Sequence, residues 1–223
     1  MGQTITLSAK DGFKPTAYEA KPSGKARGGL VMVQEIFGVN NHMKRTADVY
    51  AAAGYHVVAP GFFDRVGKDI QLGYGEADIA KGREIRGKLN WDQILADVQA
   101  GIDALKGAGK LGIIGYCFGG SVAWLGATRF KDFSASVCFY GGNIAQFSEE
   151  KPNCPVQMHF GEKDQSIPMT DVEAIRAAQP NVEVFVYPGA EHGFGCDERG
   201  SFSKPDADLA QQRTLAFFAS HLG

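Results

Sequence analysis

Residues Ile113–Ser121 have the sequence IIGYCFGGS. Residues 115–119, GYCFG, have the spacing of the G-x-S-x-G nucleophile elbow, with a cysteine in place of the serine. The apolar run Lys110–Tyr116 before the motif predicts a strand, and Gly120–Phe130 after it predicts a helix. Cys117 therefore falls at a strand-to-helix turn, where glycines permit a tight bend and a helix N-terminus favours negative charge on sulfur.

The rest of the chain alternates short apolar runs with amphipathic segments. The apolar runs have the length of strands buried on both faces, and they are Gly29–Gln34, Tyr55–Pro60, Lys110–Tyr116, Ser134–Tyr140, Pro155–Phe160 and Val182–Tyr187. The amphipathic segments predict helices at Met43–Ala53, Trp91–Leu105, Gly120–Phe130, Met169–Ala178 and Ala207–His221. Together they predict an α/β fold with a doubly wound, mostly parallel sheet and helices on both faces.

Two further segments lie outside that alternation. Gln3–Leu7 alternates polar and apolar residues like an opening strand, which outweighs the loose myristoylation pattern at the N-terminus. Gly61–Lys88 is richer in glycine and charge, and we expect it to form an excursion over the sheet edge. With 223 residues, 44% of them hydrophobic and 22% charged, we expect one domain spanning residues 1–223.

Charge and composition limit the partners. The formal charge of −2 shows no basic stripe, so we expect no nucleic acid and no membrane surface as a partner, but a small molecule. No apolar run is long enough for a bilayer and no secretory signal is present, which predicts a cytoplasmic protein. We expect a monomer, with a dimer as the alternative. The four cysteines form no C-x-x-C pair and no zinc spacing, so we expect free thiols and no metal site.

An acid and a histidine follow the elbow at later strand ends. Asp164 lies in HFGEKDQSIP, and His192 lies in YPGAEHGFG. The chain order Cys117, Asp164, His192 is the order of nucleophile, acid and base in α/β-hydrolases. His192 would take the thiol proton and later return a proton to the leaving group, while Asp164 fixes the tautomer of the ring.

Three nearby groups compete for these roles. Glu162 is the neighbouring acid, but Asp164 comes later in the loop, where reach to the histidine is easier. Ser121 falls inside the helix turn rather than at its apex, and His159 lies within a strand, where a core role is expected.

The oxyanion of an acyl-transfer reaction needs two donors. By elbow geometry one is the backbone N–H of Phe118, and the other comes from the loop after an early strand. In VQEIFGVN that donor is the N–H of Ile36. Glu35 then lies close to the reacting centre, where it could interact with the thiol, although a solvent-facing loop glutamate is the alternative.

The segments QEIFGVN, GYCFGG, GEKDQSIP and EHGF jointly resemble the dienelactone hydrolase family of α/β-hydrolases over nearly the whole chain. The resemblance implies a triad of Cys117, Asp164 and His192, with oxyanion donors at Ile36 and Phe118. It also implies that Glu35 helps to ionise the cysteine: the resting thiol is partly held away from the histidine until substrate repositions this glutamate.

The family reaction opens 4-carboxymethylenebut-2-en-4-olide, a dienelactone, to maleylacetate in chloroaromatic breakdown, and implies neither metal nor organic cofactor. Well-known members hold the substrate carboxylate with two arginines, one of them four residues after the histidine. That position is Cys196 here, so we predict Arg199 as its replacement and Arg83 as the other arginine, with Arg86 as a competitor.

We also predict that Phe37 and Tyr140 contribute to substrate binding. Two other functional classes stay open at this point. One is a broader carboxylesterase without a carboxylate requirement, which loss of the second arginine would favour. The other is a non-catalytic binding or thiol-sensing module, in which Cys117 responds to oxidants.

Overall fold

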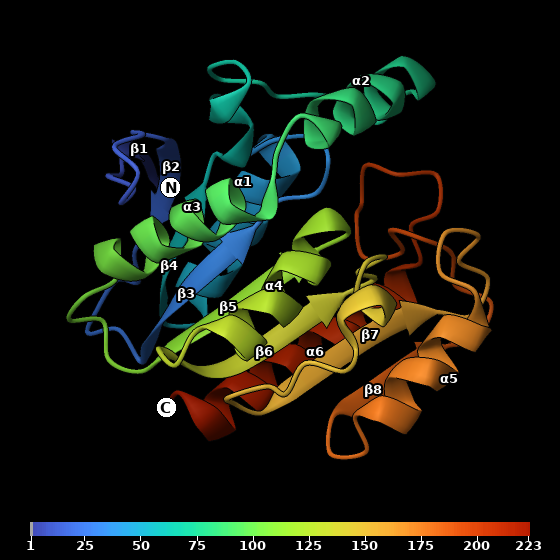
Figure 1. Ribbon diagram of the computed structural model, residues 1–223. Coiled ribbons are helices and arrows are strands. Elements are labelled where there is room, and N and C mark those ends of the chain that lie inside the picture. The colour runs from blue at the N-terminus through green and yellow to red at the C-terminus, as the bar shows by residue number, and fades with distance from the viewer. Residues whose placement is uncertain (1) are drawn as a thin grey trace. The chain divides into compact units, whose positions relative to one another are not determined.

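The apolar runs of the first half of the chain form four strands. In the computed structural model, which describes residues 2–223, the chain divides into one unit that ends at Leu111 and another that begins at Gly112 (Figure 1). The strands of the first unit are β1 (Gln3–Thr6), β2 (Thr16–Ala20), β3 (Gly28–Val33) and β4 (Tyr55–Pro60).

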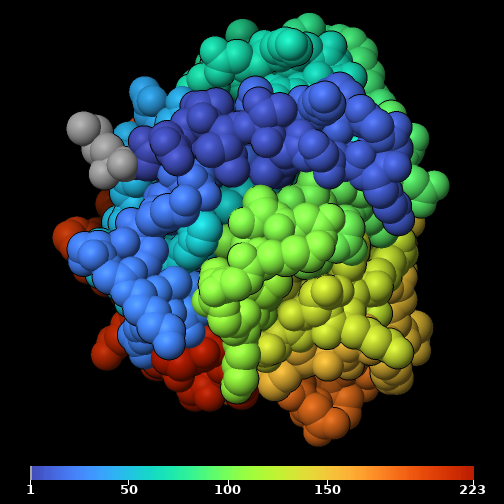
Figure 2. Space-filling model, turned by 90° about the vertical axis from the view of Figure 1, so that its left-hand side faces the viewer, coloured from blue at the N-terminus to red at the C-terminus, as the bar shows by residue number. Residues whose placement is uncertain are grey.

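Their order is β1-β2-β4-β3. β3 pairs with β4 in parallel, whereas β1–β2 and β2–β4 are antiparallel. Every residue of β3 is buried, as expected for a central strand with a continuous apolar sequence. The N-terminal segment forms a dark blue band on the surface in Figure 2, which agrees with the exposure of most of β1.

Three helices complete the first unit. α1 (Asn41–Ala52) and α3 (Trp91–Ala104) pack on the strands. Each helix follows an asparagine whose side chain accepts the backbone N–H of the third helical residue. The segment Gly61–Lys88 contains a short 3-10 turn, Phe62–Arg65, and an unexpected helix, α2 (Glu76–Gly87).

The second unit has the strand order β5-β6-β7-β8. These strands are β5 (Leu111–Tyr116), β6 (Phe133–Phe139), β7 (Val156–Gly161) and β8 (Glu183–Tyr187), and the β6–β7 and β7–β8 pairs are parallel. Its helices are α4 (Phe118–Arg129), α5 (Met169–Ala178) and α6 (Lys204–His221), with a 3-10 turn at Ala145–Phe147. Figure 1 shows α4 in front of these strands and α6 behind them, so both faces are covered.

The predicted α/β fold, mostly parallel with helices over the strands, is confirmed, and the differences are local. Each predicted strand is present within about two residues of its expected bounds. α4 begins two residues earlier than predicted, at Phe118, and α6 begins at Lys204 rather than Ala207. All four cysteines are free, as predicted. Across residues 2–223, no helix has the length and apolar character needed to cross a membrane.

Candidate active site

The turn between β5 and α4 is a strained elbow. β5 ends at Tyr116 and α4 begins at Phe118, which leaves Cys117 alone between them with φ 56° and ψ −117°. A positive φ is unfavourable for a residue with a side chain. The Cys117 N–H donates to the carbonyl of Phe139 at 3.0 Å, and its own carbonyl accepts from the N–H of Gly120 at 2.9 Å. These bonds hold the sulfur-bearing residue at the apex of the turn.

Two glycines make this turn possible. A Cβ at Gly115 would lie 1.8 Å from the carbonyl oxygen of Gly119, and one at Gly120 would lie 2.3 Å from that of Phe139. Neither backbone atom can move away as a side chain could. The strand and the helix can therefore approach this closely only because both positions lack a side chain.

Asp164 and His192 meet in the loops after β7 and β8. The Nδ1 atom of His192 lies 2.7 Å from Oδ2 of Asp164, whose side chain is fully buried. The other carboxylate oxygen, Oδ1, accepts the N–H of Ser166 at 2.8 Å. On the histidine loop, the hydroxyl of Ser201 donates to the His192 carbonyl at 2.7 Å. Both members of the pair are thus held by hydrogen bonds from their surroundings, and nothing in the sequence pattern had pointed to Ser201.

The ring of His192 also interacts with Cys117. Burial alone would lower the pKa of His192, but the negative charge of Cys117 and hydrogen bonds with Asp164 and Cys117 raise that pKa from 6.5 to about 10. The structure therefore brings the three residues into one hydrogen-bonded chain. The expectation that the resting thiol is partly held away from the histidine until substrate binds stays a prediction.

The competing groups have other partners. Glu162 is exposed, and its Oε2 accepts the N–H of Gly189 at 2.8 Å. Ser121 is buried, and its hydroxyl accepts the N–H of Asn143 at 2.9 Å. These contacts leave Asp164 as the acid that bonds to His192.

His159 has the core role that its strand position suggested. Its ring is fully buried, lies 2.8 Å from the Tyr187 hydroxyl and 3.0 Å from Gln157 Oε1, and stacks on Phe139 with ring centroids 4.4 Å apart. Burial, together with the charge of Arg213, lowers the pKa of His159 to about 3. This histidine therefore stays neutral over the physiological range.

An aromatic wall stands beside His192. The ring centroid of Tyr140 lies 5.1 Å from that of His192, and Phe194 lies 5.5 Å from Tyr140 on another side. Tyr140 is fully buried and has φ 37°, a second strained residue at a strand end. This predicted substrate-binding residue thus lies where it restricts the orientation of the imidazole.

The loop after β3 carries Glu35, Ile36 and Phe37 in the first unit. Glu35 is buried at 1% exposure, which excludes the alternative of a solvent-facing glutamate. Phe37 is also buried and packs on Tyr74, with ring centroids 4.5 Å apart. Its carbonyl accepts the N–H of Leu72 at 2.9 Å. The loop is thus fixed by residues 72–74, none of which the sequence had singled out.

The three candidate arginines differ in their surroundings. Arg83 is exposed on α2. Arg86 on the same helix donates to the carbonyl of Leu89 and lies 4.6 Å above the ring of Trp91, and burial lowers its pKa. Arg86 thus has a packing role, and the assignment of Arg83 to the substrate carboxylate stays a prediction.

Arg199 lies against the backbone of the histidine loop. A Cβ at Gly193, the residue after His192, would come within 2.5 Å of Arg199 Cδ and 2.6 Å of its Nη1. Gly193 has φ 79°, a conformation that favours glycine. Cys196, at the position where the family has an arginine, is fully buried. Within this loop, the guanidinium of Arg199 therefore lies against Gly193, the residue that follows the histidine.

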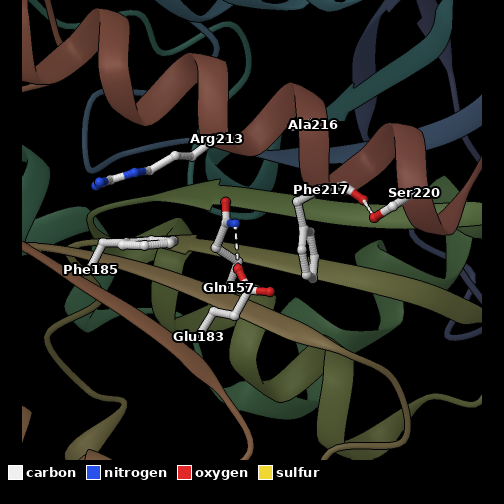
Figure 3. Close-up of a pocket in the computed structure, with 7 residues that line it drawn as sticks. All are labelled: Gln157, Glu183, Phe185, Arg213, Ala216, Phe217 and Ser220. Atoms are coloured by element: carbon white, nitrogen blue, oxygen red, sulfur yellow. Dashed lines mark hydrogen bonds between the residues drawn. The ribbon is translucent and has the colours of Figure 1, made fainter.

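A separate hollow of about 310 Å³ lies between β7, β8 and the C-terminal part of α6 (Figure 3). Its lining residues are Gln157, Glu183, Phe185, Arg213, Ala216, Phe217 and Ser220. Gln157 donates to Glu183, and Arg213 lies 4.1 Å above the Phe185 ring. These polar groups of the hollow therefore interact with other residues that line it. No triad residue lines it, and we assign it no part in the reaction.

The sequence profile described as "Dienelactone hydrolase family" matches residues 16–222. Two relatives, from Synechocystis sp. and Azospirillum brasilense, are each named "Putative carboxymethylenebutenolidase". The first is 33% identical over 239 residues, covering 98% of this chain and 97% of the relative; the second is 34% identical over 241 residues, covering 98% and 99%.

Among solved structures, "Putative Dienelactone Hydrolase" from Klebsiella pneumoniae is 31% identical, covers 98% of this chain and 99% of its own, and has a TM-score of 0.85. The elbow, the strand-end acid and histidine and the parallel strands define an α/β-hydrolase. More narrowly, the chain belongs to the dienelactone hydrolase family. It is a hydrolase that acts on ester bonds, lactones included.

Proposed function

We propose that this hydrolase uses Cys117 to open an unsaturated, carboxylate-bearing lactone, dienelactone, through a thioester acyl-enzyme. The observation that carries the proposal is the hydrogen-bonded chain from Cys117 through His192 to Asp164. A histidine of raised pKa next to a sulfur can take the thiol proton and later act as the acid for the leaving group.

The first half-reaction makes the thioester. The sulfur of Cys117 attacks the lactone carbonyl, and the carbonyl electron pair moves onto oxygen. The backbone N–H groups of Phe118 and Ile36 are proposed to stabilise that oxyanion. When the carbonyl reforms, the ring C–O bond breaks and His192 gives its proton to the departing enol oxygen.

The second half-reaction regenerates the enzyme. His192, now neutral, takes a proton from a water molecule, which attacks the thioester carbon. Breakdown of the tetrahedral intermediate releases the carboxylic acid and returns Cys117 to its thiolate, with the proton left on His192. The released enol becomes the ketone of maleylacetate. Throughout, Asp164 holds Nδ1 of the imidazole and stabilises its protonated form.

The remaining roles follow from the family resemblance. Glu35 is proposed to assist ionisation of Cys117. Arg83 and Arg199 are proposed to bind the substrate carboxylate, with Phe37 and Tyr140 beside the substrate. A pathway of aromatic degradation in the cytoplasm is part of the proposal, and four free thiols fit a reducing compartment.

A specific observation favours one alternative, a broader carboxylesterase for small neutral esters. The family arginine four residues after the histidine is Cys196 here, and that residue is fully buried. A pocket with one cation fewer would discriminate less strongly between an acid and a neutral ester.

The experiment measures turnover of dienelactone and of p-nitrophenyl acetate by the wild type, by Cys117→Ala and by the control Cys154→Ala. Cys154 is half-buried, and burial raises its pKa to about 12, so its thiol is inert. We expect Cys117→Ala to lose all turnover with an unchanged circular dichroism spectrum, and Cys154→Ala to keep it. Full activity in Cys117→Ala would contradict the assignment of the nucleophile, and equal preference for both substrates would favour the carboxylesterase.

A further inference from the structure

The segment that follows β4 encloses the loop after β3. Leu72 donates its N–H to the Phe37 carbonyl at 2.9 Å, and Asn40 donates through Nδ2 to the Leu72 carbonyl and the Tyr74 hydroxyl, both at 3.1 Å. A Cβ at Gly38 would lie 1.9 Å from the carbonyl oxygen of Ile70. Backbone therefore lies directly on backbone along this side of the loop.

α2 makes the same kind of contact on the residue before Phe37. A Cβ at Gly82 would lie 2.1 Å from the carbonyl oxygen of Ile36, 3.1 Å from its carbonyl carbon and 3.3 Å from its Cβ. Gly82 is one of the two buried residues of α2, the other being Ile85. Its missing side chain is what lets the helix touch the Ile36 peptide.

A glycine at position 82, in the interior of α2, lowers the stability of the helix. In the middle of a helix it destabilises by about 0.5–1 kcal/mol relative to alanine. Gly82 has no positive φ to justify it. A Cβ added at Gly87, at the end of the same helix, would meet nothing within 4 Å, so the two glycines of α2 differ in this contact. The close approach to Ile36 is therefore the physical reason for glycine at position 82.

We propose that Gly82 is a positioning residue for the oxyanion-binding N–H of Ile36. The inference rests on the proposed function, in which that N–H stabilises the developing oxyanion. The carbonyl and the N–H of Ile36 belong to the two peptide planes that meet at its Cα atom. Pressing on the carbonyl therefore rotates the residue and changes the direction of the N–H.

The size of the disturbance follows from the contact. An alanine Cβ at 2.1 Å from the Ile36 oxygen falls more than 1 Å short of the 3.4 Å at which ordinary van der Waals contact begins. Loss of one oxyanion donor lowers kcat by about 10²–10³-fold, and a displacement of about 1 Å can cost about 10²-fold. A partial reorientation of one donor is thus expected to lower kcat by about tenfold to a hundredfold.

The test compares Gly82→Ala with Gly87→Ala, the same chemical change on the same helix without the contact. The substrate is p-nitrophenyl acetate, which has no carboxylate, so movement of the neighbouring Arg83 does not affect the result. In parallel, the rate of Cys117 alkylation by iodoacetamide is measured by mass spectrometry. Alkylation displaces iodide at a saturated carbon and develops no oxyanion, so it reports on the nucleophile alone.

We expect Gly82→Ala to lower kcat at least tenfold with KM changed less than threefold, and to leave the alkylation rate within twofold of the wild type. Gly87→Ala should match the wild type in both measurements. Equal kcat values for the two variants, or a parallel fall in turnover and alkylation, would overturn the positioning role while the proposed function stands. No turnover of either p-nitrophenyl acetate or dienelactone by the wild type would overturn the proposed function, and the positioning role with it.

A second variant covers the case in which Gly82→Ala does not fold. Tyr74→Phe keeps the ring on Phe37 but removes the hydroxyl that accepts from Asn40, and so loosens the same loop without a clash. We expect kcat to fall about twofold to tenfold with alkylation unchanged, the rate equivalent of the about 0.5–1.5 kcal/mol that a single hydrogen bond contributes. An unchanged kcat in this variant would overturn the proposal that this segment positions the loop.

Discussion

The titration of His192 offers the most direct test of the site. Its pKa is raised from 6.5 to about 10, although burial alone would lower it, because the charge of Cys117 and the hydrogen bonds with Asp164 and Cys117 favour the protonated ring. At about 1.4 kcal/mol per pH unit, the rise corresponds to about 5 kcal/mol of preference for the protonated form. Replacing Cys117 by alanine removes the sulfur charge and one hydrogen bond and leaves Asp164 in place.

We expect the pKa of His192 to be about 1–3 pH units lower in Cys117→Ala than in the wild type, the usual effect of removing one opposite charge in contact. The assay is a pH titration of ¹⁵N-histidine-labelled protein by NMR. His159, whose pKa is lowered to about 3, stays neutral throughout and serves as an internal reference. Cys154→Ala is the matched control and should leave the His192 titration unchanged.

The same shift fixes the sign of a stability effect. Because the folded pKa of His192 lies above its unfolded value, the protonated ring stabilises the fold fully below pH 6.5, and this contribution is lost as the pH rises through about 10. The melting temperature of the wild type should therefore fall more steeply between pH 7 and pH 10 than that of Cys117→Ala. A wild-type His192 that titrates near 6.5, or an identical titration in Cys117→Ala, would refute the thiolate–imidazolium reasoning.

Three further pairs of substitutions have defined outcomes. Asp164→Asn should lower kcat by about 10³–10⁴-fold because the imidazole loses its partner, while Glu162→Gln stays within about twofold in the same ester assay; similar losses in both would mean that the acid is misassigned. Arg83→Ala should raise KM for dienelactone far more than for p-nitrophenyl acetate, with a weaker effect of Arg199→Ala, and equal losses on both substrates would remove the carboxylate-binding role. Asp97→Ala should lower the free energy of unfolding in urea by about 1.5–3 kcal/mol because the buried Arg65 loses its two-point partner and keeps only the ion pair with Asp11, whereas the exposed Asp103→Ala on the same helix should change it by less than about 1 kcal/mol.

The elbow was predictable from the sequence because its signal is local. The motif is contiguous: Cys117 lies between Gly115 and Gly119, directly after the strand. The atom that excludes a side chain at Gly115, the Gly119 carbonyl oxygen, belongs to the same five residues. The choice between Asp164 and Glu162 was harder, because both follow the same strand. The choice depends on which carboxylate the turn directs inward. Glu162 instead accepts a hydrogen bond from the N–H of Gly189, a contact between distant residues that a local sequence pattern does not contain.

Other features were missed for physical reasons. α2 has only two buried residues, so its sequence EADIAKGREIRG carries no apolar stripe by which a helix is recognised. β2, TAYEA, contains a buried glutamate, Glu19, whose oxygens bond to His56 and Gln3, and such a strand has no continuous apolar run. In both cases the segment is stabilised by contacts with residues distant in the sequence, which a local pattern does not contain.

The backbone at Cys117 has a consequence for how variants of this enzyme should be selected. A residue with a side chain at φ 56° and ψ −117° carries about 1–3 kcal/mol of conformational strain, which glycine would relieve. Cys117 is only half-buried, so removing its short side chain would leave little cavity to offset that gain. At this position the backbone strain and the interaction of the sulfur with His192 have opposite effects on stability. Glycine at position 117 would relieve the strain but would also remove the sulfur that favours the protonated ring of His192, so melting temperature alone does not report on the role of this residue and variants have to be selected on turnover as well.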